Sequence, residues 1–120
     1  MAWVYEVMTK SFYLNGKFQF KAMYAGAWGY KDDVAFECVK FKGPLPRGKY
    51  HIGRMQATHP KAGKHVIRLT PHPGNSMCDR DGFLIHGDNG KGTASNGCIV
   101  TRLYDRKKIA ESHDQELIVK

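Results

Sequence analysis

Short runs in which apolar and polar residues alternate fill the start of the chain and favour β-strands. Residues 3–7 and 11–14 are rich in aromatic and β-branched side chains, which pack well on a pleated sheet. The Asn-Gly pair at 15–16 follows, and it is a strong hairpin signal because both positions of a type I′ turn require a positive φ. Beyond this turn Phe18 and Phe20 alternate with polar residues, which predicts a half-buried strand with both rings on its buried face.

The rest of the chain continues this pattern, with one exception near its end. Further strands are predicted at the apolar runs 49–53, 65–69, 83–85, 98–100 and 117–119, and loops at 26–33, 43–48, 71–77 and 88–96. The exception is residues 103–112, whose apolar positions have near-helical spacing after Thr101, the expected N-cap. We therefore expect a single domain over residues 1–120, a mainly β fold built as a small sandwich or barrel with one packed α-helix.

Composition excludes several classes of protein. The 120 residues are 42% hydrophobic and 12% aromatic, which argues against intrinsic disorder and is enough for an ordinary core. The longest apolar run, residues 22–29, is too short for a transmembrane helix, so we expect no membrane insertion. Residues 1–6 lack the basic and apolar regions of a secretory signal. If the protein leaves its cell, we expect it to do so without a signal peptide.

The charge balance is strongly basic. Nineteen Lys and Arg residues against eleven Asp and Glu residues leave a net charge of +8. Such a charge favours anionic partners such as nucleic acid, an acidic membrane surface or a cell-wall polymer. The basic residues are scattered along the chain and form no run of five or six, so charge alone indicates no mechanism.

Two predicted strands flank the residues with chemical potential. His86 follows one strand, and Cys98 begins another after Gly97. A thiol becomes a good nucleophile as the thiolate, which a nearby imidazole produces by accepting the proton. Gly97 would allow a sharp turn and leave amide N–H groups free to face an oxyanion. The alternative is that Cys98 is a small core residue and His86 a half-buried ring.

The arrangement of these residues resembles the L,D-transpeptidase catalytic domain, the YkuD-like fold. Residues 85–87, Ile-His-Gly, and residues 95–98, Ser-Asn-Gly-Cys, resemble the family signature of a His-Gly after a central strand and a later Ser-His-Gly-Cys segment. Residues 43–53 resemble its Pro-x-Gly-x-Tyr stretch, and residues 24–26 and Cys38 extend the resemblance over most of the chain. The chain is most similar to the small type VI secretion L,D-transpeptidase effectors, which lack a signal peptide.

The resemblance implies roles for particular residues. It makes Cys98 the nucleophile, His86 the general base, and the amides around Gly97 and Cys98 the oxyanion hole. Two departures mark a subfamily: Asn96 stands where the housekeeping enzymes have His, and an arginine follows two places later than theirs, at Arg102. The remaining assignments are second-rank. Ser95 and Asn96 would bind substrate or orient His86, and carboxylate recognition would fall to Arg102 or to no residue in its place. Asp88 or Asn89 could orient His86, but the simpler interpretation of Asp88 is a solvated loop carboxylate.

The resemblance also implies a substrate and a setting. Cys98 would attack the carbonyl of the third residue of a peptidoglycan stem peptide, a diaminopimelate, and expel the terminal D-alanine without a cofactor. We expect L,D-carboxypeptidase hydrolysis or D-amino-acid exchange to dominate over cross-linking, which needs an ordered site for a second stem. The implied setting is an antibacterial toxin that type VI secretion components deliver into the periplasm of a target bacterium, with a cognate immunity protein as a further partner and no role for nucleic acid.

Non-catalytic functions compete with this interpretation. A basic β domain could bind nucleic acid, although the chain has no RNP-type motif or dense basic stripe, or it could bind the cell wall without catalysis. A zinc hydrolase would need three ligands such as His72, Cys78 and His86, but no HxxxH or HExxH spacing supports it.

The three cysteines leave two further expectations. Cys38 and Cys78 are structural and can form a disulfide in an oxidising periplasm, but their spacing does not determine the pairing. For Cys98 we expect a pKa below the ~8.5 of a free thiol, because His86 would stabilise the thiolate.

Overall fold

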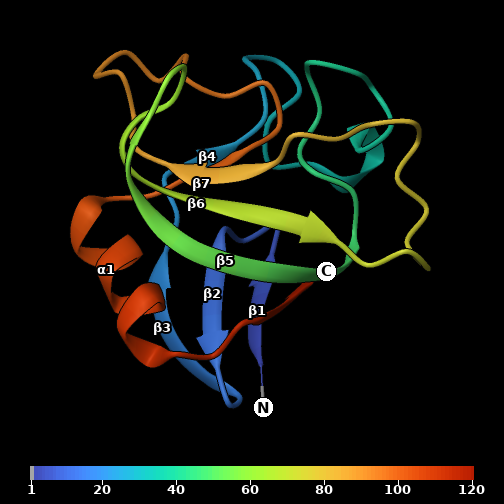
Figure 1. Cartoon of the computed structure of the whole chain (residues 1–120). Coiled ribbons are helices and arrows are strands. Elements are labelled where there is room, and N and C mark those ends of the chain that lie inside the picture. The colour runs from blue at the N-terminus through green and yellow to red at the C-terminus, as the bar shows by residue number, and fades with distance from the viewer. Residues whose placement is uncertain (1) are drawn as a thin grey trace.

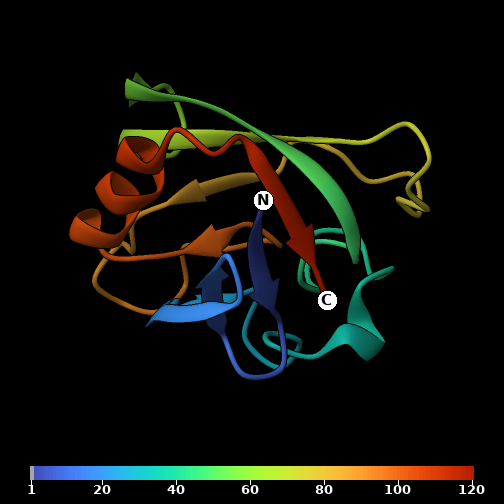
Figure 2. The same cartoon turned by 90° about the horizontal axis from the view of Figure 1, so that it is seen from below.

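The computed structural model describes residues 2–120, which form a strongly curved sheet of nine strands with one α-helix packed on it (Figures 1 and 2). The strands follow the order β3-β2-β1-β9-β5-β6-β7-β8-β4 across the sheet. Their bounds are β1 Trp3–Glu6, β2 Ser11–Leu14, β3 Lys17–Lys21, β4 Tyr24–Ala25, β5 Gly48–His59, β6 Gly63–Pro71, β7 Leu84–His86, β8 Ile99–Val100 and β9 Glu116–Val119. A 3-10 turn, η1, covers Val34–Phe36, and the helix α1 covers Leu103–Ser112. The predicted fold class, mainly β with one packed helix, is confirmed.

The two ends of the chain meet in the middle of the sheet. β9 runs parallel to β1 on one side, with Trp3 opposite Leu117, and antiparallel to β5 on the other. Figure 2 shows β9 and β1 next to each other below the long strands. The last strand therefore joins the N-terminal hairpins to the part of the sheet that carries β7 and β8.

Aromatic side chains form the core beneath β1 to β3. The Phe12 ring lies 4.7 Å from the Tyr5 ring and 4.9 Å from the Phe20 ring, and Trp3 packs 6.2 Å from Phe12 with its edge toward it. All four side chains are buried. Such rings bury large apolar areas and favour tilted or edge-on contacts, so this cluster supplies much of the hydrophobic stabilisation.

The predicted alternation in β3 is wrong at one position. Phe20 is buried, whereas Phe18 is 54% exposed and packs edge-on against Tyr13. The reason is a β-bulge: Phe12 pairs with Phe20, but its neighbour Tyr13 pairs with Phe18. The extra residue moves Phe18 off the buried face, because a one-residue slip reverses the direction of a side chain.

Two predicted boundaries also differ. The short strands expected at 49–53 and 65–69 are parts of a long hairpin, β5 and β6, which extends over residues 48–71. The helix is capped by Arg102, without a side-chain hydrogen bond, rather than by Thr101, whose amide donates to the His86 carbonyl oxygen (2.9 Å). Thr101 therefore links the start of α1 to the end of β7. Within residues 2–120 no helix is long and apolar enough to cross a membrane.

Candidate active site

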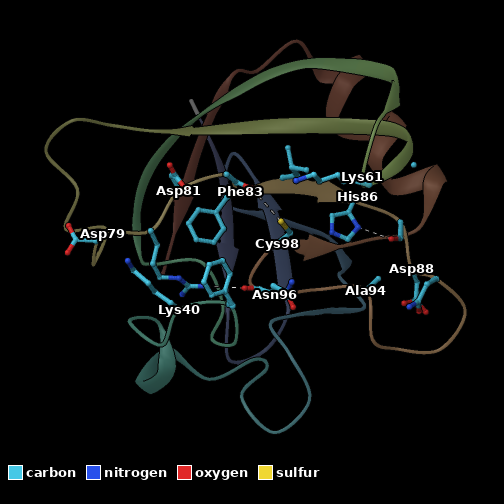
Figure 3. A pocket seen from close by; sticks show the side chains of 18 residues that line it. Lys40, Lys61, Asp79, Asp81, Phe83, His86, Asp88, Ala94, Asn96 and Cys98 are labelled. Atoms are coloured by element: carbon cyan, nitrogen blue, oxygen red, sulfur yellow. Dashed lines mark hydrogen bonds between the residues drawn. The ribbon is translucent and has the colours of Figure 1, made fainter.

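Parallel pairing of β7 with β8 brings Cys98 and His86 together. Ile85 lies opposite Ile99, and His86 lies opposite Val100. Cys98 precedes β8 by one residue, so the two-residue period of a strand places it on the same face as His86. Both side chains line a cavity of about 870 Å³, and Figure 3 shows the sulfur atom and the imidazole ring next to each other.

One hydrogen bond defines the tautomer of His86. The side chain is only 5% exposed, and its Nδ1 lies 2.8 Å from the carbonyl oxygen of Gly87. A carbonyl oxygen can only accept, so Nδ1 carries the proton in the neutral ring and Nε2 is left as the acceptor. Burial lowers the pKa of His86, and the positive charge of Arg106 lowers it further. The ring is therefore neutral near pH 7 and available as a base.

The pKa of Cys98 does not follow the sequence-based expectation. Burial raises the thiol pKa above its ordinary value, and this effect outweighs the opposing effects of the Leu84 and Cys98 amide N–H groups and the charge of Arg80. The expected depressed pKa is wrong, because burial removes the water that stabilises a thiolate. The resting pair is a neutral thiol beside a neutral imidazole, and the proton must move as the sulfur attacks.

Ser95 and Gly97 shape the loop before the cysteine. The Ser95 hydroxyl donates to the Cys98 carbonyl oxygen (2.6 Å) and accepts from the amides of Gly26 (2.9 Å) and Gly97 (3.0 Å). Neither Ser95 nor Gly97 lines the cavity. Because the Gly97 amide is already bonded to Ser95, the amide of this segment that faces the sulfur is that of Cys98.

Gly97 is required for a steric reason. Its φ is +141°, and a Cβ at this position would lie 2.6 Å from Nη2 of Arg80 and 2.9 Å from the Phe83 ring. Only glycine tolerates both this conformation and this close approach.

The other predicted site residues lie in different places. Asn96 is exposed and lines the cavity. Arg102 does not line it: its side chain is 70% exposed and lies 3.9 Å from Asp105 at the start of α1. Asp88 lines the cavity and accepts a hydrogen bond from the Tyr24 hydroxyl (2.6 Å), while Asn89 bonds within its own loop to Thr93. His86 is thus oriented by the Gly87 carbonyl, not by a side-chain hydrogen bond from Asp88 or Asn89.

Two buried arginines near the site were missed by sequence analysis. Arg106, on α1, packs against Gly87 and donates to the carbonyl oxygens of His65 and Thr101. Arg80, in the loop before β7, donates to four backbone carbonyl oxygens and lines the cavity. No local signal separates these two from the other basic residues of the chain, because their burial depends on segments far away in the sequence.

The cysteine pairing that the sequence left open is defined by the structure. Cys38 and Cys78 form a disulfide with their Cα atoms 5.3 Å apart, and Cys98 has a free thiol. Cys78 therefore cannot serve as a zinc ligand here, and the zinc site of His72, Cys78 and His86 is wrong. In residues 2–120 no group of three or more His, Cys, Asp or Glu side chains is placed to hold a metal.

Charges of both signs line the cavity. Lys40 and Lys61 lie on opposite sides of it, and Asp79, Asp81 and Asp88 lie around its edge (Figure 3). The net charge of +8 is therefore not concentrated at this site.

Comparison with known proteins agrees with this geometry. The family model of the Tlde1 domain matches residues 19–118, a range that includes Cys98, His86 and both buried arginines. The chain belongs to the Tlde1 domain family. This is a family of type VI secretion L,D-transpeptidase effectors, and the predicted family resemblance is confirmed.

A solved structure supports the same fold for this Tlde1 domain. An L,D-transpeptidase from Mycobacterium smegmatis superposes with a TM-score of 0.58 at 16% sequence identity, covering 99% of this chain and 58% of that one. At this identity the likeness shows the fold alone, and the Tlde1 domain spans little more than half the length of that chain. No curated protein sequence matches the chain significantly. The family model therefore shows the family of this chain, and the solved structure shows its fold.

Proposed function

We propose that this Tlde1 domain is a cysteine acyl-transfer enzyme that removes or exchanges the terminal D-alanine of peptidoglycan stem peptides. The observation that carries the proposal is the pairing in the cavity: Cys98 has a free thiol, and His86 has Nδ1 bonded to Gly87 and Nε2 open as an acceptor. A nucleophile, an adjacent base and a group that orients the base are the three parts that covalent acyl transfer needs.

The reaction follows from these two side chains. Nε2 of His86 accepts the thiol proton as Sγ of Cys98 bonds to the carbonyl carbon of the third stem residue. The bond to the D-alanine nitrogen then breaks, and the proton on His86 passes to that amine as it leaves. A thioester to Cys98 remains. Water, or the amine of a free D-amino acid, attacks it with His86 again as the base, and the proton returns to the thiolate.

Backbone amides stabilise the negative charge in this scheme. The Cys98 N–H lies beside the attacking sulfur, where a tetrahedral oxyanion would form. Asn96, which is exposed in the cavity, supplies a side-chain amide where the housekeeping enzymes have a histidine. The Gly97 amide is bonded to Ser95 in the resting structure, so we assign Gly97 to the shape of the loop.

The mixed charge of the cavity fits a stem peptide. Diaminopimelate and the terminal alanine carry carboxylates, which suit Lys40 and Lys61, and the diaminopimelate ammonium suits Asp79, Asp81 or Asp88. Arg102 lies outside the cavity, so we assign carboxylate recognition to the lysines in its place. Water and free amino acids need only access to the thioester, which the cavity provides, whereas cross-linking needs an ordered site for a second stem, so we expect hydrolysis and exchange to dominate.

The family supports a proposal for the biological role. We propose that the protein is an antibacterial toxin that acts in the periplasm of a target bacterium after delivery by type VI secretion, and that a cognate immunity protein protects the producing cell. An oxidising periplasm would also maintain the Cys38–Cys78 disulfide.

The test uses purified muropeptides with tetrapeptide stems. Wild-type protein is expected to convert them to tripeptides with release of D-alanine, or to exchanged stems when a free D-amino acid is added, as measured by mass spectrometry. His86→Gln is expected to lose this activity. His72→Gln, a histidine outside the cavity, is the matched control and is expected to keep it.

Other products would lead to different conclusions. Stems linked mainly as dimers would replace the hydrolase with a cross-linking enzyme that uses the same residues. Binding to peptidoglycan without any change in mass would favour a non-catalytic wall-binding domain. Binding to nucleic acid with no effect on muropeptides would overturn the proposed function.

A further inference from the structure

Among residues 2–120, Arg80 is a buried cation without a carboxylate partner. It is 7% exposed, and neither of the ion pairs found within residues 2–120 includes it. The acidic side chain on the loop that Arg80 contacts, Glu37, is paired with Arg47 at 2.9 Å. A buried charge is costly unless it is compensated, so its environment should show what balances it.

Backbone carbonyl groups from two separate loops surround the guanidinium group. Nη1 donates to the carbonyl oxygens of Glu37 (2.5 Å) and Pro44 (2.9 Å), and Nη2 donates to those of Gly43 (2.8 Å) and Asn96 (3.1 Å). The planar fork of arginine can serve several acceptors at once, which a lysine ammonium cannot do in the same geometry.

These bonds end next to the nucleophile. Asn96 is two residues before Cys98, and Gly97 between them is the position where an added Cβ would meet Nη2 of Arg80. The guanidinium carbon also lies 5.1 Å from the centre of the Phe83 ring, which flanks Cys98 on the side away from His86 (Figure 3). The positive charge of Arg80 lowers the pKa of the Cys98 thiol, whereas burial raises it.

We propose that Arg80 is a positioning residue for the nucleophile: it fixes the 95–98 loop against the 37–44 loop, and its otherwise unpaired charge balances the thiolate of Cys98 as that anion forms. The carbonyl dipoles compensate the cation in the resting enzyme, and the thiolate becomes its counter-ion during attack. Arg80 stays charged throughout, since an arginine does not titrate in proteins. This inference rests on Cys98 as the nucleophile and adds a residue on which that cysteine depends.

Several charged and titratable groups surround the sulfur of Cys98, and an experiment must separate the effect of Arg80 from theirs. His86 lies on β7, Arg80 on the loop before it, and Lys40 and Lys61 at the cavity edge, with Asp79 and Asp81 on either side of Arg80 in the sequence. Replacing Arg80 alone leaves all of the others in place.

The experiment compares two variants that differ in charge, Arg80→Lys and Arg80→Gln. Alkylation of Cys98 by iodoacetamide is measured against pH, a readout that needs no peptidoglycan and is independent of the proposed substrate. The other two cysteines form the disulfide, so Cys98 is the reactive thiol. We expect Arg80→Gln to shift the alkylation profile to higher pH and Arg80→Lys to keep it near wild type.

The loop-fixing role has its own readout. Both variants lose the fork that holds four carbonyl groups, so kcat on tetrapeptide stems should fall up to ~100-fold, the scale expected for a misplacement of about 1 Å, with a smaller change in KM. The matched control is Arg47→Gln, which replaces an exposed arginine that pairs with the Glu37 carboxylate, and it should change neither readout. Identical alkylation profiles for the Lys and Gln variants would overturn the charge role, and an unchanged kcat would overturn the positioning role.

A measurement that leaves Arg80 in place covers the case in which its variants do not fold. Iodoacetate is an anion and iodoacetamide is neutral, so in a Lys40→Gln, Lys61→Gln variant, which removes the two exposed lysines of the cavity, Arg80 should still raise the ratio of their rates at Cys98 above the ratio for free cysteine. An equal or lower ratio would contradict a compensating charge at this thiol. If alkylation behaves as expected and stems are not cleaved, the proposed substrate is wrong while the role of Arg80 stands.

Discussion

The aromatic core under β1 to β3 and the loops around the cavity are stabilised in different ways. In the core, the rings of Trp3, Tyr5, Phe12 and Phe20 pack against one another beneath paired strands. Around the cavity, residues 37–44, 77–83 and 88–98 lie mostly outside the sheet ladder. Their carbonyl groups accept hydrogen bonds partly from backbone amides of other loops and partly from side chains, and four of them accept from Arg80.

The core and the cavity loops are stabilised differently because only the loops have to leave a reactive side chain accessible. A reactive thiol has to face an open cavity, so the segments around it cannot be covered on all sides by apolar packing. Loop backbone without strand partners still needs hydrogen bonds where it is buried. A buried guanidinium group meets this need, and the Cys38–Cys78 disulfide links two of the loops covalently; neither closes the cavity. Changes in the core should therefore affect stability, and changes in the loops should affect activity.

The largest effect is expected from Cys98→Ala. Release of D-alanine should fall to background because the nucleophile is gone, while the melting temperature should stay close to that of wild type because the thiol is only partly buried. Mass spectrometry of muropeptides and thermal unfolding test the two parts. Residual release at a substantial fraction of the wild-type rate would mean that another group attacks the stem.

In the aromatic core, Phe12→Ala should reduce the free energy of unfolding by ~3–5 kcal/mol, as expected for a buried phenylalanine. At a temperature where the variant is folded, kcat should remain near the wild-type value. Phe18→Ala is the matched control: its ring is exposed, so the loss should stay within ~1 kcal/mol. Denaturant unfolding measures both, and equal losses would contradict the bulge that separates the two rings.

The disulfide should contribute to both properties. The double variant Cys38→Ser, Cys78→Ser is expected to lose ~2–4 kcal/mol of stability, since the bond closes a loop with a sequence separation of 40. Its kcat should also fall, because Cys38 and Cys78 connect the two loops that contain Glu37 and Arg80. Denaturant unfolding and muropeptide assays measure the two effects, and a loss of stability at full kcat would separate the disulfide from the site.

The pH dependence of kcat/KM reports on His86. Its pKa is lowered below the ordinary ~6.5, chiefly by burial, while Arg106 and His59 lower it further and the Gly87 carbonyl and Asp88 raise it. The neutral ring is the base, so activity should be full above this pKa and fall as pH drops through it. Below that pKa the loss should approach tenfold per pH unit.

The lowered pKa of His86 also makes the free energy of unfolding depend on pH. Because the unfolded chain binds a proton to this histidine at a higher pH than the folded protein does, stability should decline as pH falls below ~6.5. His86→Gln should remove this part of the pH dependence, as measured by denaturant unfolding at several pH values. An acid limb of activity above pH 6.5 would argue against a buried neutral base.

The smallest effect is expected from Tyr24→Phe. The hydroxyl donates to Asp88 (2.6 Å) and accepts from the Ala94 amide (2.8 Å), so it holds both ends of the 88–96 loop. Its loss should cost about 1 kcal/mol and raise KM more than it lowers kcat, because the loop forms one wall of the cavity. Tyr13→Phe is the control: the Tyr13 hydroxyl contacts Glu6, neither residue lines the cavity, and KM should stay unchanged. An unchanged KM in Tyr24→Phe would show that this loop does not bind the stem.

Much of the local structure could be predicted from short segments of sequence. The Asn-Gly pair at 15–16 forms a turn in which both residues have a positive φ, and the helix at Leu103–Ser112 has its expected length. The His-Gly and Gly-Cys segments at the strand ends predicted which two side chains share a cavity, because the family signature already records that pairing. Two local predictions were wrong. Phe18 is exposed because of the bulge in its pairing with β2, and Thr101 does not cap the helix because its amide bonds to the His86 carbonyl oxygen.

The class of fold, the family and the proximity of Cys98 and His86 could be predicted from the sequence, because turn geometry, two-residue alternation and signature motifs act over a few neighbouring residues. Three features required the folded chain: the pairing of the cysteines, the contact of Arg80 with the loop before Cys98, and the raised pKa of Cys98. These properties depend on burial and on contacts between residues 16 to 43 positions apart. No local pattern encodes them, since desolvation and hydrogen bonding to distant carbonyl groups exist only once the loops have been brought together by the fold.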